Sequence, residues 1–369
     1  MPLFVDSART PVHWAADRYP SIIKDAGKFG GTAAGLRIAL VNNMPDAALE
    51  NTESQFFDLL NAAAGDEPVQ VKLFSLPKIS RSERAQQHLD NFYSSTTVLL
   101  NQRFDGVIIT GTEPRQPDLR DELYWQPLAE LFDWAEENTF SAVLSCLAAH
   151  AGVLHSDGIY RKPLAKKRFG VFEQRKTDHF MMSGTSGSIR IPHSRWNEVT
   201  EEDLTAAGYS IVTKSTRAGV DLFVKEKKKS LFAYFQGHPE YVAETLYKEY
   251  RRDVKRYLRA ERETYPLVPE GYFGSTSVRL LEDFRVRAKA ERHENMMKEF
   301  PEGNIVGSLQ HSWLPCSRQI YKNWLGCITS RKQDAREISI MANIGAARSV
   351  AFEASTCPHV SPANGVPLS

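Results

Sequence analysis

Apolar and polar residues follow one another in blocks that predict strands and helices in turn. Residues 36–43, 69–76 and 104–111 are short apolar runs that end in polar residues or glycine, as buried strands do. Residues 47–65 and the segment ERAQQHLDNFYSS have helical spacing, and residues 124–138 predict a further helix before the strand-like run SAVLSC. This order predicts a parallel sheet covered by helices, with functional residues at the carboxyl ends of its strands.

The second half of the chain has a different pattern. Short runs separated by polar turns, from FGVFEQ to SLFAYFQGHPEY, predict a more antiparallel extension of the same sheet. Residues 244–263 predict a strongly charged helix that closes the domain, and residues 277–299 predict another helical stretch. We therefore divide the chain into an N-terminal extension (1–34), a domain (35–330) and a C-terminal extension (331–369). Most of that last segment predicts either a helix docked on the core or a loose extension.

Composition and charge narrow the class of protein. The chain has 369 residues, of which 42% are apolar and 25% charged, as in globular proteins with one large or two smaller domains. Its 46 Lys and Arg residues nearly balance 45 Asp and Glu residues, which argues against nucleic acid or an anionic membrane as a partner. No apolar run has the ~18–20 residues that span a bilayer, and the N-terminus lacks a signal-like pattern. We expect a cytoplasmic protein with a small-molecule partner.

Four cysteines are present, and one of them stands out. Cys146, Cys316, Cys327 and Cys357 show no Cys-x-x-Cys pair and no metal-ligand spacing, so we expect reduced thiols and no metal. The last three have packing or tail contexts. Cys146 lies between a predicted strand and a predicted helix, where a side chain projects above the sheet and the helix N-terminus favours a thiolate. A buried structural cysteine at a strand end is the alternative.

A second motif, FQGHPEY, offers a partner for this thiol. His238 follows a predicted strand, and Glu240 is two positions further on, so both side chains point the same way if the turn at Pro239 is tight. A carboxylate could then orient the histidine as a base for the cysteine. A lone histidine is more often a surface or core residue, and the pairing with Cys146 is what favours a catalytic interpretation.

Nine ordered motifs resemble the homoserine O-acyltransferases of the MetA type over residues 35–330. They are LVNNMPDAALENTESQF, FDGVIITGTEP, LRDELYW, SCLAAHA, KKRFGVFE, PHSRWNEV, AGVDLF, FQGHPEYVAETLYKEYRRDV and a YF pair near residue 272. The resemblance implies a class I glutamine amidotransferase-like (flavodoxin-like) α/β fold, with a mostly parallel sheet, helices on both faces and a C-terminal helical extension. It also implies acyl transfer from acyl-CoA to L-homoserine in methionine biosynthesis, no cofactor beyond this co-substrate, and a homodimer.

The resemblance assigns roles to particular residues. By their motif positions, Cys146 is the acyl-accepting nucleophile, His238 the general base and Glu240 the third member of a triad. Lys167, Ser194 and Arg252 match substrate-binding positions. Without the resemblance, Lys167 would be assigned to a solvated loop, Ser194 to a turn and Arg252 to an ion pair with Asp253 or Glu249.

The chemistry of a thioester donor adds further candidates. A tetrahedral oxyanion needs hydrogen-bond donors, and the expected ones are the N–H of Leu147 and a backbone N–H in the loop of Gly111 and Thr112. Arg115 stands where acetyl-transferring members tend to have glutamate and succinyl-transferring ones glycine. We hypothesise that its guanidinium pairs with the distal carboxylate of a succinyl group, so succinyl-CoA is favoured over acetyl-CoA. Pairing of Arg115 with Glu113 or Asp118 is the alternative.

One departure from the family pattern and three alternative functions stay open on sequence grounds. Asp46 and Ala47 occupy positions where many family members carry lysine. A glutamine amidotransferase-like hydrolase would share the fold and triad, and a binding protein would need an inert Cys146. L-Serine, one methylene shorter than L-homoserine, is an alternative acceptor, since a methylene is worth only ~1–3 kcal/mol of discrimination.

Overall fold

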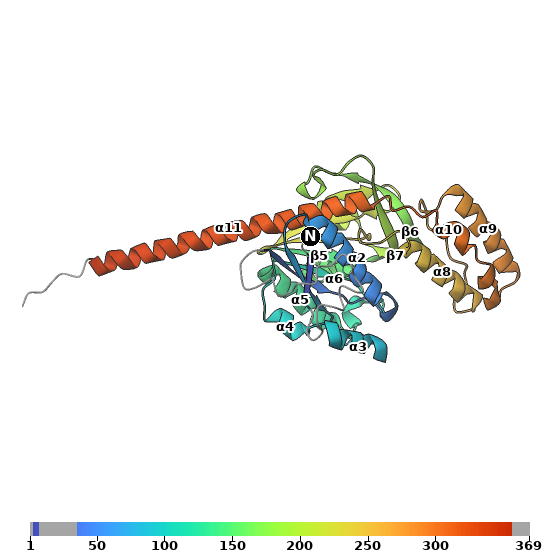
Figure 1. The fold of residues 1–369 in the computed structure, drawn as a ribbon, viewed down its shortest axis with the longest axis horizontal. Coiled ribbons are helices and arrows are strands. Elements are labelled where there is room, and N and C mark those ends of the chain that lie inside the picture. Colours follow the sequence, from blue (N-terminus) through green and yellow to red (C-terminus); the bar gives the residue numbers. More distant parts are fainter. Residues whose placement is uncertain (1–2, 7–34, 356–369) are drawn as a thin grey trace, which may run out of the picture. The chain divides into compact units, whose positions relative to one another are not determined.

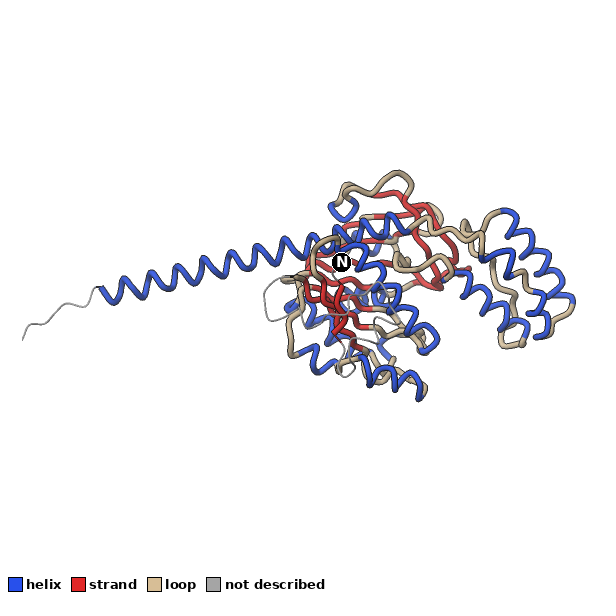
Figure 2. The backbone as a smooth tube through the Cα atoms, in the orientation of Figure 1, coloured by secondary structure: helices blue, strands red, loops and turns tan. Residues whose placement is uncertain are grey.

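The computed structural model describes residues 3–6 and 35–355, with side chains over residues 3–6 and 35–342. The chain divides into two compact units, residues 1–328 and 329–369. The first unit contains two sheets and most of the helices, and every candidate site residue lies in it (Figure 1, Figure 2). Within the second unit, the described residues continue one helix, α11 (Leu314–Ser355).

The main sheet has eight strands in the order β1-β3-β2-β4-β5-β12-β11-β8. In chain order they are β1 (Leu3–Asp6), β2 (Leu36–Val41), β3 (Val69–Phe74), β4 (Gly106–Ile109), β5 (Ser141–Ser145), β8 (Ser210–Ile211), β11 (Leu222–Lys227) and β12 (Ser230–Phe235). The first six in spatial order are parallel, and β11 pairs antiparallel with both β12 and β8. The predicted parallel sheet is therefore confirmed, with β1 as a strand that the sequence pattern did not predict.

Helices cover both faces of this sheet because its strands carry apolar residues on both sides. Ile38 and Leu40 point into one apolar core and Ala39 and Val41 into the other. The first core is covered by α2 (Asp46–Ala64), α3 (Glu83–Phe92) and the start of α11; the second is covered by α5 (Trp125–Asn138) and α6 (Leu147–Asp157). The predicted α/β class with helices on both faces is confirmed.

The prediction that the later strands all extend the main sheet is wrong. β6 (Lys162–Lys176), β7 (Ile189–Glu198), β9 (Thr213–Ser215) and β10 (Gly219–Val220) form a separate antiparallel sheet in the order β10-β9-β6-β7. Only β8 and β11 extend the main sheet antiparallel, whereas β12 runs parallel to β5. All six residues of β12 are buried, as expected for a central strand with a neighbour on each side and a covered surface on each face.

The helical extension after β12 has its own apolar core. It contains α8 (Thr245–Leu258), α9 (Ser275–Ala290), the 3₁₀ helix η4 (Glu294–Glu299) and α10 (Glu302–Val306). The remaining short helices are α4 (Thr96–Leu100), η2 (Leu119–Asp121), η3 (Phe180–Met182) and α7 (Glu201–Ala206). Residues 331–355, for which a helix and a loose extension were both open, are helical, and the C-terminal helical extension is confirmed.

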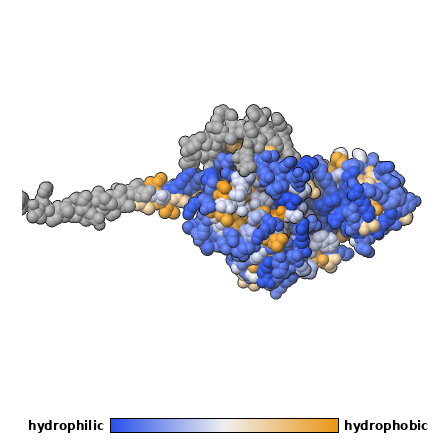
Figure 3. Space-filling model, turned by 90° about the horizontal axis from the view of Figure 1, so that it is seen from below, coloured by the Kyte–Doolittle hydropathy of each residue, from blue (hydrophilic) through white to orange (hydrophobic). Residues whose placement is uncertain are grey.

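The surface and the other cysteines agree with the expected packing. Hydrophilic residues dominate the face drawn in Figure 3, and along the described chain we find no helix that is long and apolar enough to cross a membrane. Cys316 and Cys327 pack partly buried against the first core, and Cys316 is a free thiol. Burial raises the pKa of the Cys316 thiol to about 11, which suits a packing role. Cys357 lies outside the described residues.

Candidate active site

Cys146 is the single residue between β5 and α6. Its backbone has φ 53° and ψ −109°, a conformation that side chains other than glycine rarely adopt. Hydrogen bonds on both sides hold it there: its N–H donates to the carbonyl of Phe235 at 2.8 Å, and its carbonyl accepts from Ala149 at 3.0 Å. The predicted sharp strand-to-helix turn is present, and strain of this kind persists only where surrounding structure fixes it.

His238 and Glu240 follow the neighbouring strand β12 and meet as the sequence spacing predicted. Nδ1 of His238 lies 2.8 Å from Oε1 of Glu240, and both side chains are buried. Burial alone would lower the pKa of His238, but the Cys146 thiolate, the Glu240 carboxylate and the hydrogen bonds to both raise it well above its ordinary value. An imidazole in this environment favours its protonated form.

The loop that carries His238 is fixed from three sides. The side chain of Gln236 bonds to the backbone of Val199 and Val220 and to His150. The N–H of Gly237 donates to Oδ1 of Asp221 at 2.7 Å, and the N–H of His238 donates to the carbonyl of Pro192 at 2.8 Å. A Cβ at Gly237 would lie 2.6 Å from the Asp221 carboxylate, so only glycine fits there.

Two buried residues support this loop and were missed from the sequence. The ring of Tyr241 stacks on His238 with centroids 4.2 Å apart, and its hydroxyl donates to Glu249 at 2.8 Å. Asp221 is 1% exposed, and burial raises the pKa of its carboxyl to about 6, against the hydrogen bond from Gly237 and the charge of Arg195. The sequence gives no signal for either residue. Asp221 acts through Gly237, which is distant in the chain, and Tyr241 acts through ring stacking.

Glu249 joins two of the three predicted substrate-binding residues. The hydroxyl of Ser194 donates to Oε2 of Glu249 at 2.5 Å, and Nζ of Lys167 lies 3.4 Å from the same oxygen. Burial would raise the pKa of Glu249, but Lys167 and the hydrogen bonds from Ser194 and Tyr241 lower it below its ordinary value. The sequence analysis considered Glu249 only as a partner of Arg252. The only hint in the sequence that Glu249 faces inward was weak: it lies on α8 next to Tyr250 and four positions before Asp253, both of which are buried.

Arg252 lies at the outer end of this group. Its side chain is 55% exposed and lies 3.2 Å from Asp253, which is also 3.8 Å from Lys167. Arg252 is therefore linked to Lys167 through a shared carboxylate, as the ion-pair interpretation of the sequence anticipated. The structure places it at the mouth of the group rather than beside Cys146.

The predicted oxyanion residues lie together. Thr112 and Leu147 both line a narrow hollow with Gly111. A Cβ on Gly111 would be 2.9 Å from the backbone nitrogen of Leu147, so the loop after β4 lies directly against the Cys146 turn. The Leu147 N–H opens α6 and has no partner within that helix.

Arg115 lies in the same loop but does not pair with the acidic residues next to it. Its side chain is exposed, and its ion pair with Glu113 or Asp118 is absent from the described residues, because Asp118 instead binds Arg120 at 2.6 Å. The backbone N–H of Arg115 donates to Glu122, as does that of Gln116 at 2.7 Å. Arg115 thus has a free guanidinium on a loop held by Glu122.

The described side chains also bear on metal binding. Across residues 3–6 and 35–342, no group of three or more His, Cys, Asp or Glu side chains has the geometry to hold a metal ion. The second oxygen of Glu240 is buried without a hydrogen-bond partner among these residues.

A parallel α/β sheet that presents a cysteine on a sharp turn, beside a histidine bound to a glutamate, defines the class of cysteine-dependent hydrolases and acyltransferases. The sequence profile of one family, described as HTS: Homoserine O-succinyltransferase, matches residues 23–334. The chain belongs to this family of acyltransferases, and the resemblance drawn from the nine motifs is confirmed.

Individual relatives agree with this family. The chain is 39% identical to the homoserine O-succinyltransferase of Methylorubrum extorquens over 85% of this chain and 95% of that protein. It is 43% identical to the homoserine O-succinyltransferase of Bradyrhizobium japonicum over 79% of this chain and 89% of that protein.

Solved structures with a similar arrangement include two glutamine amidotransferases. The one from Methylobacillus flagellatus is 12% identical with a TM-score of 0.45, covering 80% of this chain and 96% of that chain. The one from Thermotoga maritima is 10% identical with a TM-score of 0.42, covering 79% of this chain and 98% of that chain.

Proposed function

We propose that this protein transfers an acyl group, succinyl in preference to acetyl, from acyl-CoA to the hydroxyl of L-homoserine in methionine biosynthesis. The observation that carries the proposal is the Cys146 turn beside the His238–Glu240 pair, in which the 2.8 Å hydrogen bond holds the imidazole. The names of the relatives support homoserine as acceptor and succinyl as the acyl group.

In the first half-reaction the Cys146 thiolate attacks the thioester carbonyl of acyl-CoA. The carbonyl π electrons move to oxygen, and the N–H of Leu147 and a backbone N–H of the Gly111 and Thr112 loop stabilise the resulting oxyanion. When the oxyanion collapses, the bond to the CoA sulfur breaks and CoA leaves with a proton from His238. One thioester replaces another at nearly equal free energy, so the acyl-enzyme keeps its reactivity toward a hydroxyl.

In the second half-reaction the neutral His238 removes the proton of the L-homoserine hydroxyl as that oxygen attacks the acyl-Cys146 carbonyl. Glu240 holds Nδ1, so the other ring nitrogen faces the reacting atoms. Collapse of the second oxyanion releases the O-acyl product and returns the thiolate beside a protonated imidazole. Two half-reactions through one site predict ping-pong kinetics.

The acceptor carries an ammonium and a carboxylate, and the group around α8 offers both opposite charges. Glu249 is the partly buried carboxylate, kept ionised by Lys167 and Ser194, and suits the ammonium. Arg252 is the exposed guanidinium at the mouth, and its planar fork suits the carboxylate. Lys167 links the two through Asp253.

The distal carboxylate of a succinyl group needs a cation near the acyl loop, and Arg161 is a candidate besides Arg115. It lines a cavity of about 320 Å³ with Asp118, Leu119 and His150, and no hydrogen bond or ion pair joins it to another described residue. Burial lowers the pKa of Arg161, while the charges of Tyr124 and Cys146 oppose this, so its guanidinium lies within electrostatic reach of the nucleophile.

Mass spectrometry of the intact protein tests the function. After brief mixing with succinyl-CoA or acetyl-CoA, we expect a mass increase of one acyl group, which L-homoserine should remove. The control Cys146→Ser cannot form this thioester. Discharge equally fast in water would favour an amidotransferase-like hydrolase, and discharge by L-serine but not L-homoserine would change the acceptor. No adduct from either donor would overturn the proposal.

Replacing the two arginines separately tests the choice of donor. We expect Arg161→Met to raise KM for succinyl-CoA about tenfold or more, the loss of one charge-assisted pair, and to leave KM for acetyl-CoA unchanged. Arg115→Met is the matched variant of Arg161→Met, because it removes the other candidate guanidinium by the same substitution. Equal effects on both donors in both variants would assign the carboxylate to neither arginine.

A further inference from the structure

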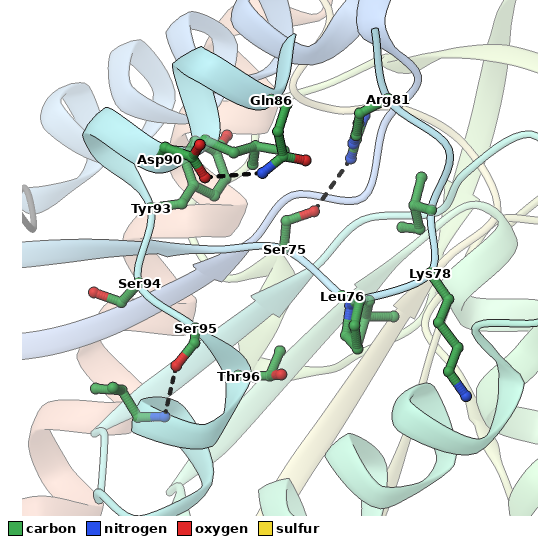
Figure 4. Close-up of a pocket in the computed structure, with 14 residues that line it drawn as sticks. Ser75, Leu76, Lys78, Arg81, Gln86, Asp90, Tyr93, Ser94, Ser95 and Thr96 are labelled. Atoms are coloured by element: carbon green, nitrogen blue, oxygen red, sulfur yellow. Dashed lines mark hydrogen bonds between the residues drawn. The ribbon is translucent and has the colours of Figure 1, made fainter. Parts of the chain in front are cut away.

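A cavity of about 540 Å³ lies at the carboxyl end of β3, and the reaction described above uses none of its residues. The loop after β3, the helix α3 and the start of α4 form its wall (Figure 4). Its volume falls within the range of about 300–1,000 Å³ typical of small-molecule sites. A position at the carboxyl ends of parallel strands is where α/β proteins bind ligands.

The charged side chains of this cavity suit an anion. Lys78 is exposed, and its ammonium has no hydrogen bond or ion pair with another described residue. Arg81 is 4% exposed; it donates to Ser75 at 3.1 Å and pairs with Asp46 at 3.3 Å. Its Nε is buried with no partner among the described residues. One cation is thus free, and a second is held rigidly with a donor unused.

The remaining lining residues are hydroxyl-bearing or apolar, apart from one acid and one amide. Asp90 is that acid, and it is bound by Gln86 at 2.9 Å on the side of the cavity opposite Lys78 (Figure 4). Ser94 and Thr96 add hydroxyl groups near the start of α4, and Leu76 and Val98 add apolar surface. Such a lining fits a ligand that combines phosphates with a flat apolar ring.

This cavity lies next to the narrow hollow beside the Cys146 turn. Leu76 lines both the cavity and the narrow hollow beside Thr112 and Leu147. Asn43 holds the two loops together, since its Oδ1 accepts from the Leu76 N–H at 3.0 Å and its side-chain amide donates to Thr110 at 3.1 Å. β3 is three strand positions from β5, or about 14 Å at ~4.8 Å per strand, which the extended arm of CoA can span.

We propose that this cavity binds the phosphorylated nucleotide end of the acyl-CoA donor, with the pantetheine arm running past Leu76 to Cys146. Lys78 pairs with a phosphate, Arg81 fixes the loop and offers its free Nε, and the apolar wall takes the adenine. The proposal rests on the acyl-CoA-dependent function given above.

The test compares donors with and without the nucleotide. We expect Lys78→Glu to raise KM for succinyl-CoA about tenfold, equivalent to about 1.4 kcal/mol, with kcat changed less than about twofold. With S-succinyl-N-acetylcysteamine, a thioester without a nucleotide, the variant should match the unsubstituted enzyme. Lys289→Glu on α9 makes the same charge change at another exposed lysine and should alter neither donor.

Inhibition by adenosine 3′,5′-bisphosphate provides a second measurement. It should compete with succinyl-CoA in the unsubstituted enzyme and bind about tenfold more weakly to Lys78→Glu. An unchanged KM for succinyl-CoA in Lys78→Glu, or an equal loss with the short thioester, would overturn the proposed subsite while the acyltransferase function stands. Acyl transfer from neither donor by the unsubstituted enzyme would overturn both.

Discussion

At the scale of single residues, Tyr241 connects His238 to the polar group around Glu249. Its ring lies 4.2 Å from that of His238, and its hydroxyl lies 2.8 Å from Glu249. One side chain therefore supports His238 by stacking and a partly buried carboxylate by a hydrogen bond. These two contributions can be separated because phenylalanine keeps the ring and loses the hydroxyl.

We expect Tyr241→Phe to raise KM for L-homoserine about tenfold, since a hydrogen bond to a charged group is worth ~1.5–3 kcal/mol. Acylation of Cys146 by the donor, measured by mass spectrometry in the absence of acceptor, should stay unchanged. Tyr241→Leu removes the ring as well and should also lower kcat. Identical kinetics for the phenylalanine and leucine variants would contradict the separation of roles.

Asp221 predicts a pH dependence of stability. Its folded pKa of about 6 lies above the ordinary value of about 3.9, so the folded state binds this proton more tightly than the unfolded state does. The contribution is full below about pH 4 and is lost as pH rises through 6, amounting to about 2–3 kcal/mol. Asp221→Asn keeps an acceptor for the Gly237 N–H but cannot ionise.

Denaturant unfolding at pH 4.5 and pH 7 measures this effect. The unsubstituted protein should lose more free energy of unfolding between these pH values than Asp221→Asn does. Parallel changes in the two proteins would mean that Asp221 is ionised in both states.

At the scale of elements, α6 depends on close contact with the strands beneath it. A Cβ on Gly152 would lie 2.5 Å from Cδ2 of Leu144 on β5 and 3.1 Å from the ring of Tyr234 on β12. The helix that begins after Cys146 is thus packed closely onto the two strands that precede Cys146 and His238.

We expect Gly152→Ala to reduce the free energy of unfolding by about 1–3 kcal/mol, because overpacking exceeds the gain in helix propensity. Gly326→Ala in α11 is the control, since a Cβ there meets nothing within 4 Å and should leave the protein equally or more stable. Equal stabilisation by both substitutions would show that α6 can move away from the sheet.

The elements also show what the sequence could predict. The alternation of apolar strands and amphipathic helices in residues 36–145 determined the parallel sheet, and the turn at Cys146 and the His238–Glu240 spacing were local patterns. The partners of β6 and β12 were not predictable, because strand pairing depends on contacts far apart in the chain. Asp221 and Glu249 were missed for the same reason, because they bind Gly237 and Ser194 from other elements.

At the scale of the whole molecule, the start of α11 completes the core of the first unit. Trp324 is fully buried, its indole N–H donates to Ser141 at 2.9 Å, and its ring approaches Gly106 on β4. The segment around Cys316 and Cys327, for which the sequence predicted only a packing context, thus closes the sheet face opposite α5 and α6.

We expect Trp324→Ala to cost about 3–5 kcal/mol of the free energy of unfolding, as for other large buried aromatic residues. Ile338→Ala, at a side chain that is 69% exposed further along α11, should change it by less than about 0.5 kcal/mol. Urea unfolding followed by tryptophan-independent circular dichroism measures both. Similar small costs would mean that α11 adds little to the core.

The contact between Trp324 and Ser141 also sets an order of events during synthesis. The two residues are 183 positions apart, so at about 5–20 residues per second a ribosome takes roughly 10 to 40 seconds to supply the second after the first. The strands that precede Cys146 and His238 emerge well before the helix that closes this face of the sheet. Until that helix emerges, the part of the sheet face that Trp324 covers lacks this partner, and we expect the nascent chain to bind chaperones that recognise apolar surfaces.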